Sequence, residues 1–108
     1  MTSHQKTTAL LAEFKVKLQQ IYGDRLKGVF LYGSRARGEA ESESDVDILV
    51  VLDDWDSYGA EVDRTGAVGS ELSLAYGLSI SRVFVRERDW LHEQTPFLIN
   101  AREEAVPA

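Results

Sequence analysis

Apolar positions along the chain follow two different spacings, and each spacing predicts a different kind of element. Between residues 5 and 22 they recur every three or four residues, which is typical of an amphipathic helix. The same spacing predicts a second helix at 59–76, followed by Gly77 as a natural C-cap. Its apolar stripe consists of Val62, Gly66, Gly69, Leu72 and Tyr76. The two glycines lower helix propensity, so we expect this helix to pack closely against a sheet.

Three short runs rich in β-branched and aromatic residues predict strands. They span residues 28–32, 45–52 and 80–86. The C-terminal part of the second run is apolar on both faces, as expected of a central strand between two layers of helices.

Shorter helical segments are expected at 34–38, at 88–93 and from Thr95 through Glu104. The last of them opens with Thr95 as N-cap and Pro96 at the first helical position. Helices and strands therefore alternate along the chain. This order predicts an α/β sandwich in which helices cover a small mixed sheet.

The composition narrows the class of protein. A chain of 108 residues with 44% hydrophobic content fits one compact domain spanning 1–108. The absence of cysteine excludes disulfides, thiolate zinc sites and thiol nucleophiles. The polar N-terminus has no signal-peptide pattern, and the longest apolar run, 48–52, is too short for a membrane span. We therefore expect a soluble cytoplasmic protein with no membrane partner.

The net charge of −6 bears on the kind of ligand that the chain binds. Proteins that bind long nucleic acids usually present a basic face to the phosphate backbone, so long DNA or RNA is disfavoured here. A single nucleotide whose charge is neutralised by a bound metal remains compatible with this balance.

Two carboxylates stand close together at the start of the second predicted strand. On a strand, side chains two residues apart point to the same face, so Asp45 and Asp47 are expected to point into one place. Two adjacent like charges repel unless a cation or water screens them. Oxygen ligands suit Mg²⁺ or Mn²⁺. Two solvated acids in the turn before a strand would explain the same pattern.

A second polar feature, Gly33-Ser34, lies where the first strand is expected to become a short helix. Glycine lets a phosphate approach the backbone, and Ser34 offers both its hydroxyl and its N–H. An ordinary strand-to-helix turn with Ser34 as N-cap is the alternative. Arg35 and Arg37 follow, either as partners of a phosphate or an acceptor or as solvated charges.

The combined pattern resembles a known signature. Gly33-Ser34, followed after ten residues by Asp45-x-Asp47, is similar to the signature of the DNA polymerase β-like nucleotidyltransferase superfamily. The strings YGSRARG at 32–38 and SDVDILV at 44–50 look most like its minimal nucleotidyltransferase branch. This resemblance implies the nucleotidyltransferase-type α/β sandwich.

The same resemblance implies a function. Members transfer a nucleoside monophosphate from a nucleoside triphosphate, here expected to be ATP, to an acceptor hydroxyl. Gly33 and Ser34 would hold the β- and γ-phosphates, and Asp45 and Asp47 would hold Mg²⁺ or Mn²⁺ and be catalytic. The minimal branch resembles antitoxins that act beside a helical HEPN-type toxin, some of which transfer AMP to a tyrosine of that toxin. A homo- or hetero-oligomer is therefore expected.

The resemblance is incomplete on the third predicted strand. Active members usually carry a third carboxylate on a later strand, but residues 80–86 contain no acid. Ser81 or Arg82 cannot act as a general base at neutral pH. The alternative function is therefore an inactive module of the same fold that neutralises a partner by contact. Nucleotide transfer to tRNA or to an antibiotic is less favoured, because such acceptors normally need additional protein surface.

The histidines and tryptophans of the chain suggest no further site. His4 and His92 have no companion at metal-ligand spacing and are expected at the surface. Trp55 and Trp90 are either exposed at an interface or partly buried, with burial favoured for Trp90.

Overall fold

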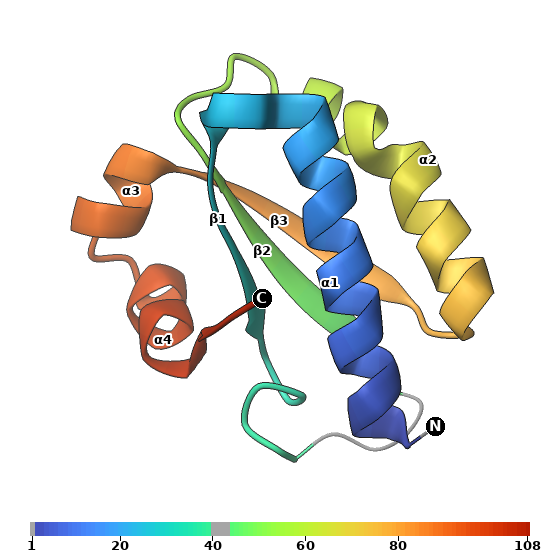
Figure 1. Ribbon diagram of the computed structural model, residues 1–108. Helices are drawn as coiled ribbons and strands as arrows, with labels where there is room; N and C mark the ends of the chain where they lie inside the picture. The colour runs from blue at the N-terminus through green and yellow to red at the C-terminus, as the bar shows by residue number, and fades with distance from the viewer. Residues whose placement is uncertain (1, 40–43) are drawn as a thin grey trace.

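The computed structural model, which describes residues 2–39 and 44–108, shows helices covering both faces of a small mixed sheet (Figure 1). Its elements are, in chain order, α1 (Ser3–Tyr22), the 3₁₀ helix η1 (Gly23–Arg25), β1 (Leu26–Tyr32), β2 (Val46–Leu52), α2 (Tyr58–Tyr76), β3 (Ile80–Arg86), α3 (Glu87–His92), α4 (Pro96–Glu104) and β4 (Val106–Pro107). The strands lie in the order β3-β2-β1-β4, with β2 antiparallel to β1 and parallel to β3. This arrangement confirms the predicted fold class.

Side-chain alternation along β2 divides the core into two layers. Val46, Ile48, Val50 and Leu52 point to the face that α1 and α2 cover, and Leu49 and Val51 point to the face that α3 and α4 cover. Every residue of β2 except Asp47 is buried. The strand therefore has the two-sided burial that its apolar sequence predicts.

Helix α1 begins two residues earlier than the apolar pattern predicts because of a capping box. The Thr2 hydroxyl accepts from the backbone N–H of Gln5 at 3.1 Å, and the Gln5 side chain accepts from the N–H of Thr2 at 2.9 Å. The side chains that α1 buries are Thr7, Leu10, Leu11, Phe14, Leu18 and Tyr22.

Helix α2 begins one residue before the predicted start and ends at Tyr76 as expected. Of the predicted stripe, Gly69 and Leu72 are buried, and Val62 and Tyr76 are partly buried against the core. The helix also buries Glu61 and Thr65. Glu61 can be buried because the Tyr22 hydroxyl donates to its Oε1 at 2.7 Å. A Cβ on Gly69 would lie 2.6 Å from Nη1 of Arg82, whereas one on Gly66 would meet no atom within 4 Å. Close packing is therefore confirmed at Gly69 and wrong at Gly66.

The short helix predicted at 34–38 is wrong, because this segment forms turns. The N–H of Glu39 donates to the Ser34 carbonyl at 3.0 Å, and that of Gly38 donates to the Arg35 carbonyl at 3.4 Å. With Gly38 at a φ of 73°, this is the closing pattern of a Schellman motif after a single turn. The sequence also predicts a polar loop at 39–44, of which residues 40–43 lie outside the described residues.

The remaining differences lie at the ends of elements. Strand β1 starts at Leu26 rather than at residue 28, and α3 covers Glu87–His92 rather than 88–93. The last helix is confirmed: Pro96 is its first residue, and the Thr95 hydroxyl accepts from the N–H of Leu98. Strand β4, which pairs with β1, has no equivalent in the sequence prediction, since two residues that include a proline carry no strand signal.

No helix in the described ranges is long and apolar enough to cross a membrane.

Candidate nucleotide and metal site

The predicted site lies where β1 ends and β2 begins. These strands are antiparallel, and Tyr32 pairs with Asp47, so the residue after β1 lies directly beside β2. That residue is Gly33, and a Cβ placed on it would collide with Oδ2 of Asp47 and lie 3.2 Å from its Cγ. Gly33 also has a φ of 77°, which other residues rarely adopt. Glycine is thus required here for its conformation and for the approach of the Asp47 carboxylate.

The two carboxylates are held differently from what the sequence predicts. Sheet pairing starts at Val46, so Asp45 is an exposed residue before β2, whereas Asp47 is half-buried within the strand. The pKa of Asp47 is raised, first by burial and then by the negative charge of Asp45, while Arg35 and Arg37 act in the opposite direction. A raised carboxyl pKa means that its charge lacks full compensation. A bound cation would supply that compensation.

Tyr32 forms a wall of the site that the sequence analysis did not select. Burial, followed by the negative charge of Asp47, raises its pKa to about 12, so the phenol stays protonated at neutral pH. Its ring meets that of Phe97 edge-on, with centroids 5.8 Å apart. Phe97 comes from the start of α4 and is 45% exposed. The position of Tyr32 directly before Gly33-Ser34 was the one sequence signal for it, and Phe97 had none.

The carboxylates of Asp45 and Asp47 suit a divalent cation that prefers oxygen ligands and takes its other ligands from a bound nucleotide. Within the described residues, no group of three or more His, Cys, Asp or Glu side chains could hold a metal ion by itself. Asp45 and Asp47 offer a pair of carboxylates. Mg²⁺ usually binds proteins through one or two carboxylates and takes its other ligands from phosphates and water. The residues present therefore fit Mg²⁺ or Mn²⁺ bound together with a nucleotide.

Comparison with known protein families identifies the family of this chain. A family model described as a nucleotidyltransferase domain matches residues 11–106. The chain belongs to this nucleotidyltransferase family.

Sequence relatives of this nucleotidyltransferase domain include two candidate protein adenylyltransferases of Methanocaldococcus jannaschii. It is 33% identical to MJ0141 over 78 residues, which cover 72% of this chain and 78% of that protein. It is 37% identical to MJ1305 over 83 residues, which cover 74% of this chain and 55% of that protein.

Solved structures share the fold of this nucleotidyltransferase domain. A candidate minimal nucleotidyltransferase superposes with a TM-score of 0.58 at 24% identity, covering 94% of this chain and 95% of that one. A toxin–antitoxin structure with AMP-PNP gives a TM-score of 0.61 at 19% identity, covering 88% and 69% of the two chains. The toxin–antitoxin MntA-HepT gives 0.55 at 17% identity, covering 92% and 69%. At these identities the likeness shows the fold alone.

On strand β3 a hydroxyl, not a carboxylate, lies next to Asp47. In the parallel pairing of β2 with β3, Asp47 lies beside Ser81, and alternation puts Ser81 on the same face as Val83 and Val85. No acid occurs anywhere on β3. Strand β3 therefore places Ser81, and no carboxylate, next to Asp47.

The two arginines between the motifs both have protein partners. The guanidinium of Arg35 donates to the Ser44 carbonyl and to hydroxyls on α1. Arg37 is exposed and forms ion pairs with Glu39 at 3.0 Å and Glu104 at 3.1 Å. Both charges lower the pKa of Asp47. Phosphate binding by either arginine stays a prediction.

The histidines and tryptophans lie as the sequence suggests. His4 and His92 are exposed. Trp90 is half-buried against Phe30, with ring centroids 5.0 Å apart. Trp55 is also half-buried, and the Arg86 guanidinium stacks over its ring at 3.8 Å. Both tryptophans therefore take part in packing.

Proposed function

We propose that this chain is a metal-dependent adenylyltransferase that moves AMP from ATP to a hydroxyl of a partner protein. The observation that carries the proposal is the contact of Gly33 with the Asp47 carboxylate. It places a backbone without a side chain, which a phosphate can approach, beside a carboxylate whose charge lacks full compensation.

In this proposal each residue has a defined part. Gly33 and Ser34 hold the β- and γ-phosphates through backbone N–H groups and the Ser34 hydroxyl. Asp45 and Asp47 hold Mg²⁺ or Mn²⁺, which when bound neutralises charge on the reacting phosphates. Tyr32 and Phe97 form an apolar wall that limits access of water to Asp47.

The transfer forms one bond and breaks one. The acceptor oxygen attacks the α-phosphorus of ATP, the bond from that phosphorus to the bridging oxygen breaks, and pyrophosphate leaves with the electron pair. The hydroxyl proton must go to a base. Ser81 cannot accept it at neutral pH, so the partner protein is proposed to supply the base.

We further propose that the partner is a HEPN-type toxin and that the chain is its antitoxin, acting in the cytoplasm as a single minimal domain within a hetero-oligomer. Two findings support this. Two relatives are named as candidate protein adenylyltransferases. Structures that share the fold come from toxin–antitoxin systems.

A second candidate function is neutralisation of the same partner by contact, without transfer. The observation that favours it is that β3, whose Ser81 lies beside Asp47, carries no acid, although active members usually bring a third carboxylate from a later strand. In that case the chain would retain nucleotide binding but would not modify its partner.

One experiment separates the two functions. ATP labelled at the α-phosphate is mixed with Mg²⁺, the partner toxin and either the wild-type chain or the double variant Asp45→Asn/Asp47→Asn. Transfer predicts label on the partner with the wild type and none with the double variant. Asp53→Asn, at the opposite end of β2, is the matched control and should label normally. Equal protection against the toxin by wild type and double variant would contradict the catalytic account.

Calorimetric titration of ATP tests the site itself. Binding should require Mg²⁺ and disappear in the double variant. No binding at millimolar ATP, with or without the partner, would contradict both the phosphate and the metal assignments.

A further inference from the structure

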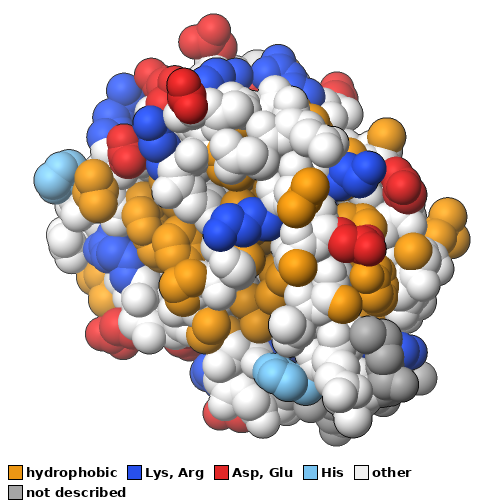
Figure 2. Space-filling model, in the orientation of Figure 1, with side chains coloured by type: hydrophobic (Ala, Val, Ile, Leu, Met, Phe, Trp, Pro, Cys, Tyr) orange, Lys and Arg blue, Asp and Glu red, His pale blue; other side chains and the backbone are white. Residues whose placement is uncertain are grey.

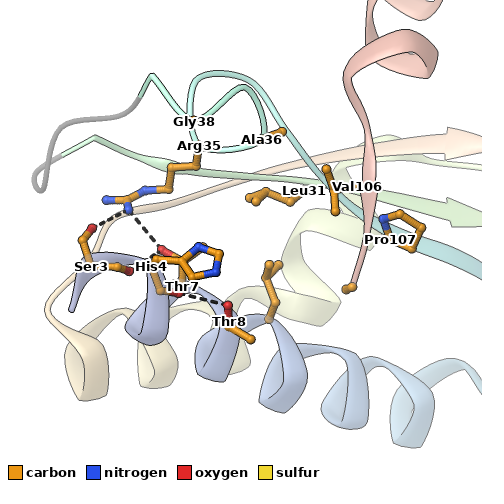
Figure 3. A pocket seen from close by; sticks show the side chains of 12 residues that line it. Ser3, His4, Thr7, Thr8, Leu31, Arg35, Ala36, Gly38, Val106 and Pro107 are labelled. Carbon is orange, nitrogen blue, oxygen red and sulfur yellow. Dashed lines mark hydrogen bonds between the residues drawn. The ribbon is translucent and has the colours of Figure 1, made fainter. Parts of the chain in front are cut away.

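The side chain of Arg35 extends from the turn after β1 to Ser3 and Thr7 of helix α1 (Figure 3). Its Nε and Nη2 donate to the carbonyl of Ser44 at 3.0 and 2.6 Å. Its Nη1 donates to Oγ of Ser3 at 2.9 Å and to Oγ1 of Thr7 at 3.0 Å. One guanidinium thus ties the turn after β1 to the residue that precedes Asp45, and ties both to helix α1.

The attachment on α1 is a rigid one. Thr7 is only 4% exposed, and its hydroxyl donates in turn to the Ser3 carbonyl at 2.9 Å. The capping box of Thr2 and Gln5 stabilises the same first turn of the helix. Arg35 is therefore fastened to a capped helix that packs on the sheet.

We propose that Arg35 is a positioning residue, which sets the spacing between the Gly33-Ser34 turn and the Asp45/Asp47 pair. A guanidinium is a planar fork of five N–H donors, and four hydrogen bonds of this fork go to Ser44 and α1. To bind a phosphate it would have to give up these contacts. The effect of this positioning role on catalysis rests on the function proposed above. The hydrogen bonds that join Ser44 and α1 through Arg35 do not depend on that function.

The physical reason is the length of the connection between the two motifs. Ten residues, 35–44, separate Ser34 from Asp45, and a connection of this length can close in many ways. A misplacement of reacting groups by about 1 Å can lower a rate about a hundredfold. A side chain that links the first residue of the connection to its last removes much of that freedom.

The structural part of the proposal is tested without any ligand, by amide hydrogen exchange. The amide of Glu39 donates to the Ser34 carbonyl, and that of Val46 donates to the Ser79 carbonyl at 2.8 Å. Losing charge-assisted hydrogen bonds in Arg35→Gln should speed exchange at both amides by about tenfold or more. Arg35→Lys should behave similarly, because an ammonium cannot bridge Ser44 and α1 together.

The control removes the same type of bond elsewhere. Arg102 also donates to two carbonyls, those of Trp90 at 2.8 Å and Glu93 at 2.7 Å. Arg102→Gln should leave exchange at Glu39 and Val46 unchanged. Should Arg35→Gln fail to fold, Thr7→Val, which removes one acceptor, is measured in its place. Unchanged exchange at both amides would overturn the proposal.

The catalytic part is tested with Mn²⁺ and ATP as separate probes. Arg35→Lys should lower the affinity for Mn²⁺ by about tenfold. This affinity is measured from the paramagnetic broadening of the Asp45 and Asp47 signals. The variant should leave ATP binding at saturating Mg²⁺ unchanged. A phosphate-binding arginine would give the opposite result, with Mn²⁺ affinity retained and ATP binding at saturating Mg²⁺ weakened, and this would overturn the proposal. A wild-type chain that binds neither probe contradicts the proposed function, while hydrogen exchange still decides the role of Arg35.

Discussion

The two ends of the central strand β2 both carry paired aspartates, but the surroundings of these aspartates differ. At the end that follows Leu52, Asp53 forms an ion pair with Arg25 at 3.1 Å and Asp54 with Arg86 at 2.8 Å. Charged side chains of both signs gather at this end, which is drawn at the top of Figure 2. At the other end Asp47 makes no ion pair with any described residue, and its pKa is raised rather than lowered.

The difference separates acids whose charge is compensated by neighbouring groups of the fold from an acid whose charge is not. The pKa values of Asp53 and Asp54 are lowered, in each case first by a hydrogen bond from the following backbone N–H and further by an arginine. Their charge is thus favoured by folding. The charge of Asp47 is disfavoured by burial and by Asp45, which is a common property of functional sites.

The largest expected effect comes from exchanging a carboxylate at the site. Asp47→Asn should lower label transfer at least about a hundredfold, since loss of even an outer partner of a metal ligand lowers activity about ten- to a hundredfold. The melting temperature should stay equal or rise, because a disfavoured charge is removed. Asp53→Asn should do the reverse, with normal transfer and a slightly lower melting temperature. Transfer assays and thermal unfolding of both variants check this, and a strongly destabilised Asp47→Asn would contradict the comparison.

Gly33→Ala should destabilise the protein, because the backbone at position 33 has a positive φ that alanine rarely adopts. A left-handed φ costs a residue with a Cβ about 1–2 kcal/mol, and the new methyl group must also displace the Asp47 carboxylate. We expect lower unfolding free energy in urea together with loss of Mg²⁺-dependent ATP binding. Gly77→Ala is the control, since Gly77 has a left-handed φ of 65° and a Cβ on it would meet no atom within 4 Å. It should reproduce the backbone penalty and leave ATP binding intact.

Tyr22→Phe tests the end of the molecule opposite the candidate site, where the buried Glu61 carboxylate accepts a hydrogen bond from Tyr22. It removes the hydroxyl that donates to Glu61, which is 3% exposed, and leaves that carboxylate without this donor. We expect a loss of about 2 kcal/mol in unfolding free energy, the range for a hydrogen bond to a charged group. Tyr32→Phe, at the site end, is the matched substitution and should change stability less. Equal losses in both variants would contradict the distinction between the two ends.

The smallest effect concerns pH. Asp54 has a folded-state pKa below its ordinary value of 3.8, so it contributes stability above that value and loses it as the pH falls through the folded pKa. The melting temperature of Asp54→Asn should therefore lie below that of wild type at neutral pH and converge with it below about pH 4. Asp63→Asn, an exposed residue of α2 without an ion pair among the described residues, should show no such convergence. A pH-independent difference would contradict the ion-pair account.

Most elements could be predicted because their signals are local. The three- and four-residue spacing located α1 and α2, the branched apolar runs located β1, β2 and β3, and Thr95-Pro96 located the start of α4. The failures lie where the local signal is weak or shared. The turn at 34–38 has a sequence that also fits a helix, and β4 consists of two residues that form a strand only because β1 offers an open edge.

The sequence by itself determined the order of the four α-helices and the first three strands, the neighbourhood of Gly33-Ser34 and Asp45/Asp47, and the absence of an acid on β3. Each of these depends on residues close together in the chain, where spacing and chemistry can be read directly.

Only the tertiary structure decided that Asp47 presses against the bare backbone of Gly33, that Ser81 lies beside it, and that Tyr32 and Phe97 wall the site. It also decided that Arg35 is fastened to Thr7 and Ser3, about thirty positions earlier in the chain. Such contacts depend on how strands pair and helices dock. Hydrophobic burial drives this packing and is not directional. The local sequence around a residue therefore does not indicate which distant residue will contact it.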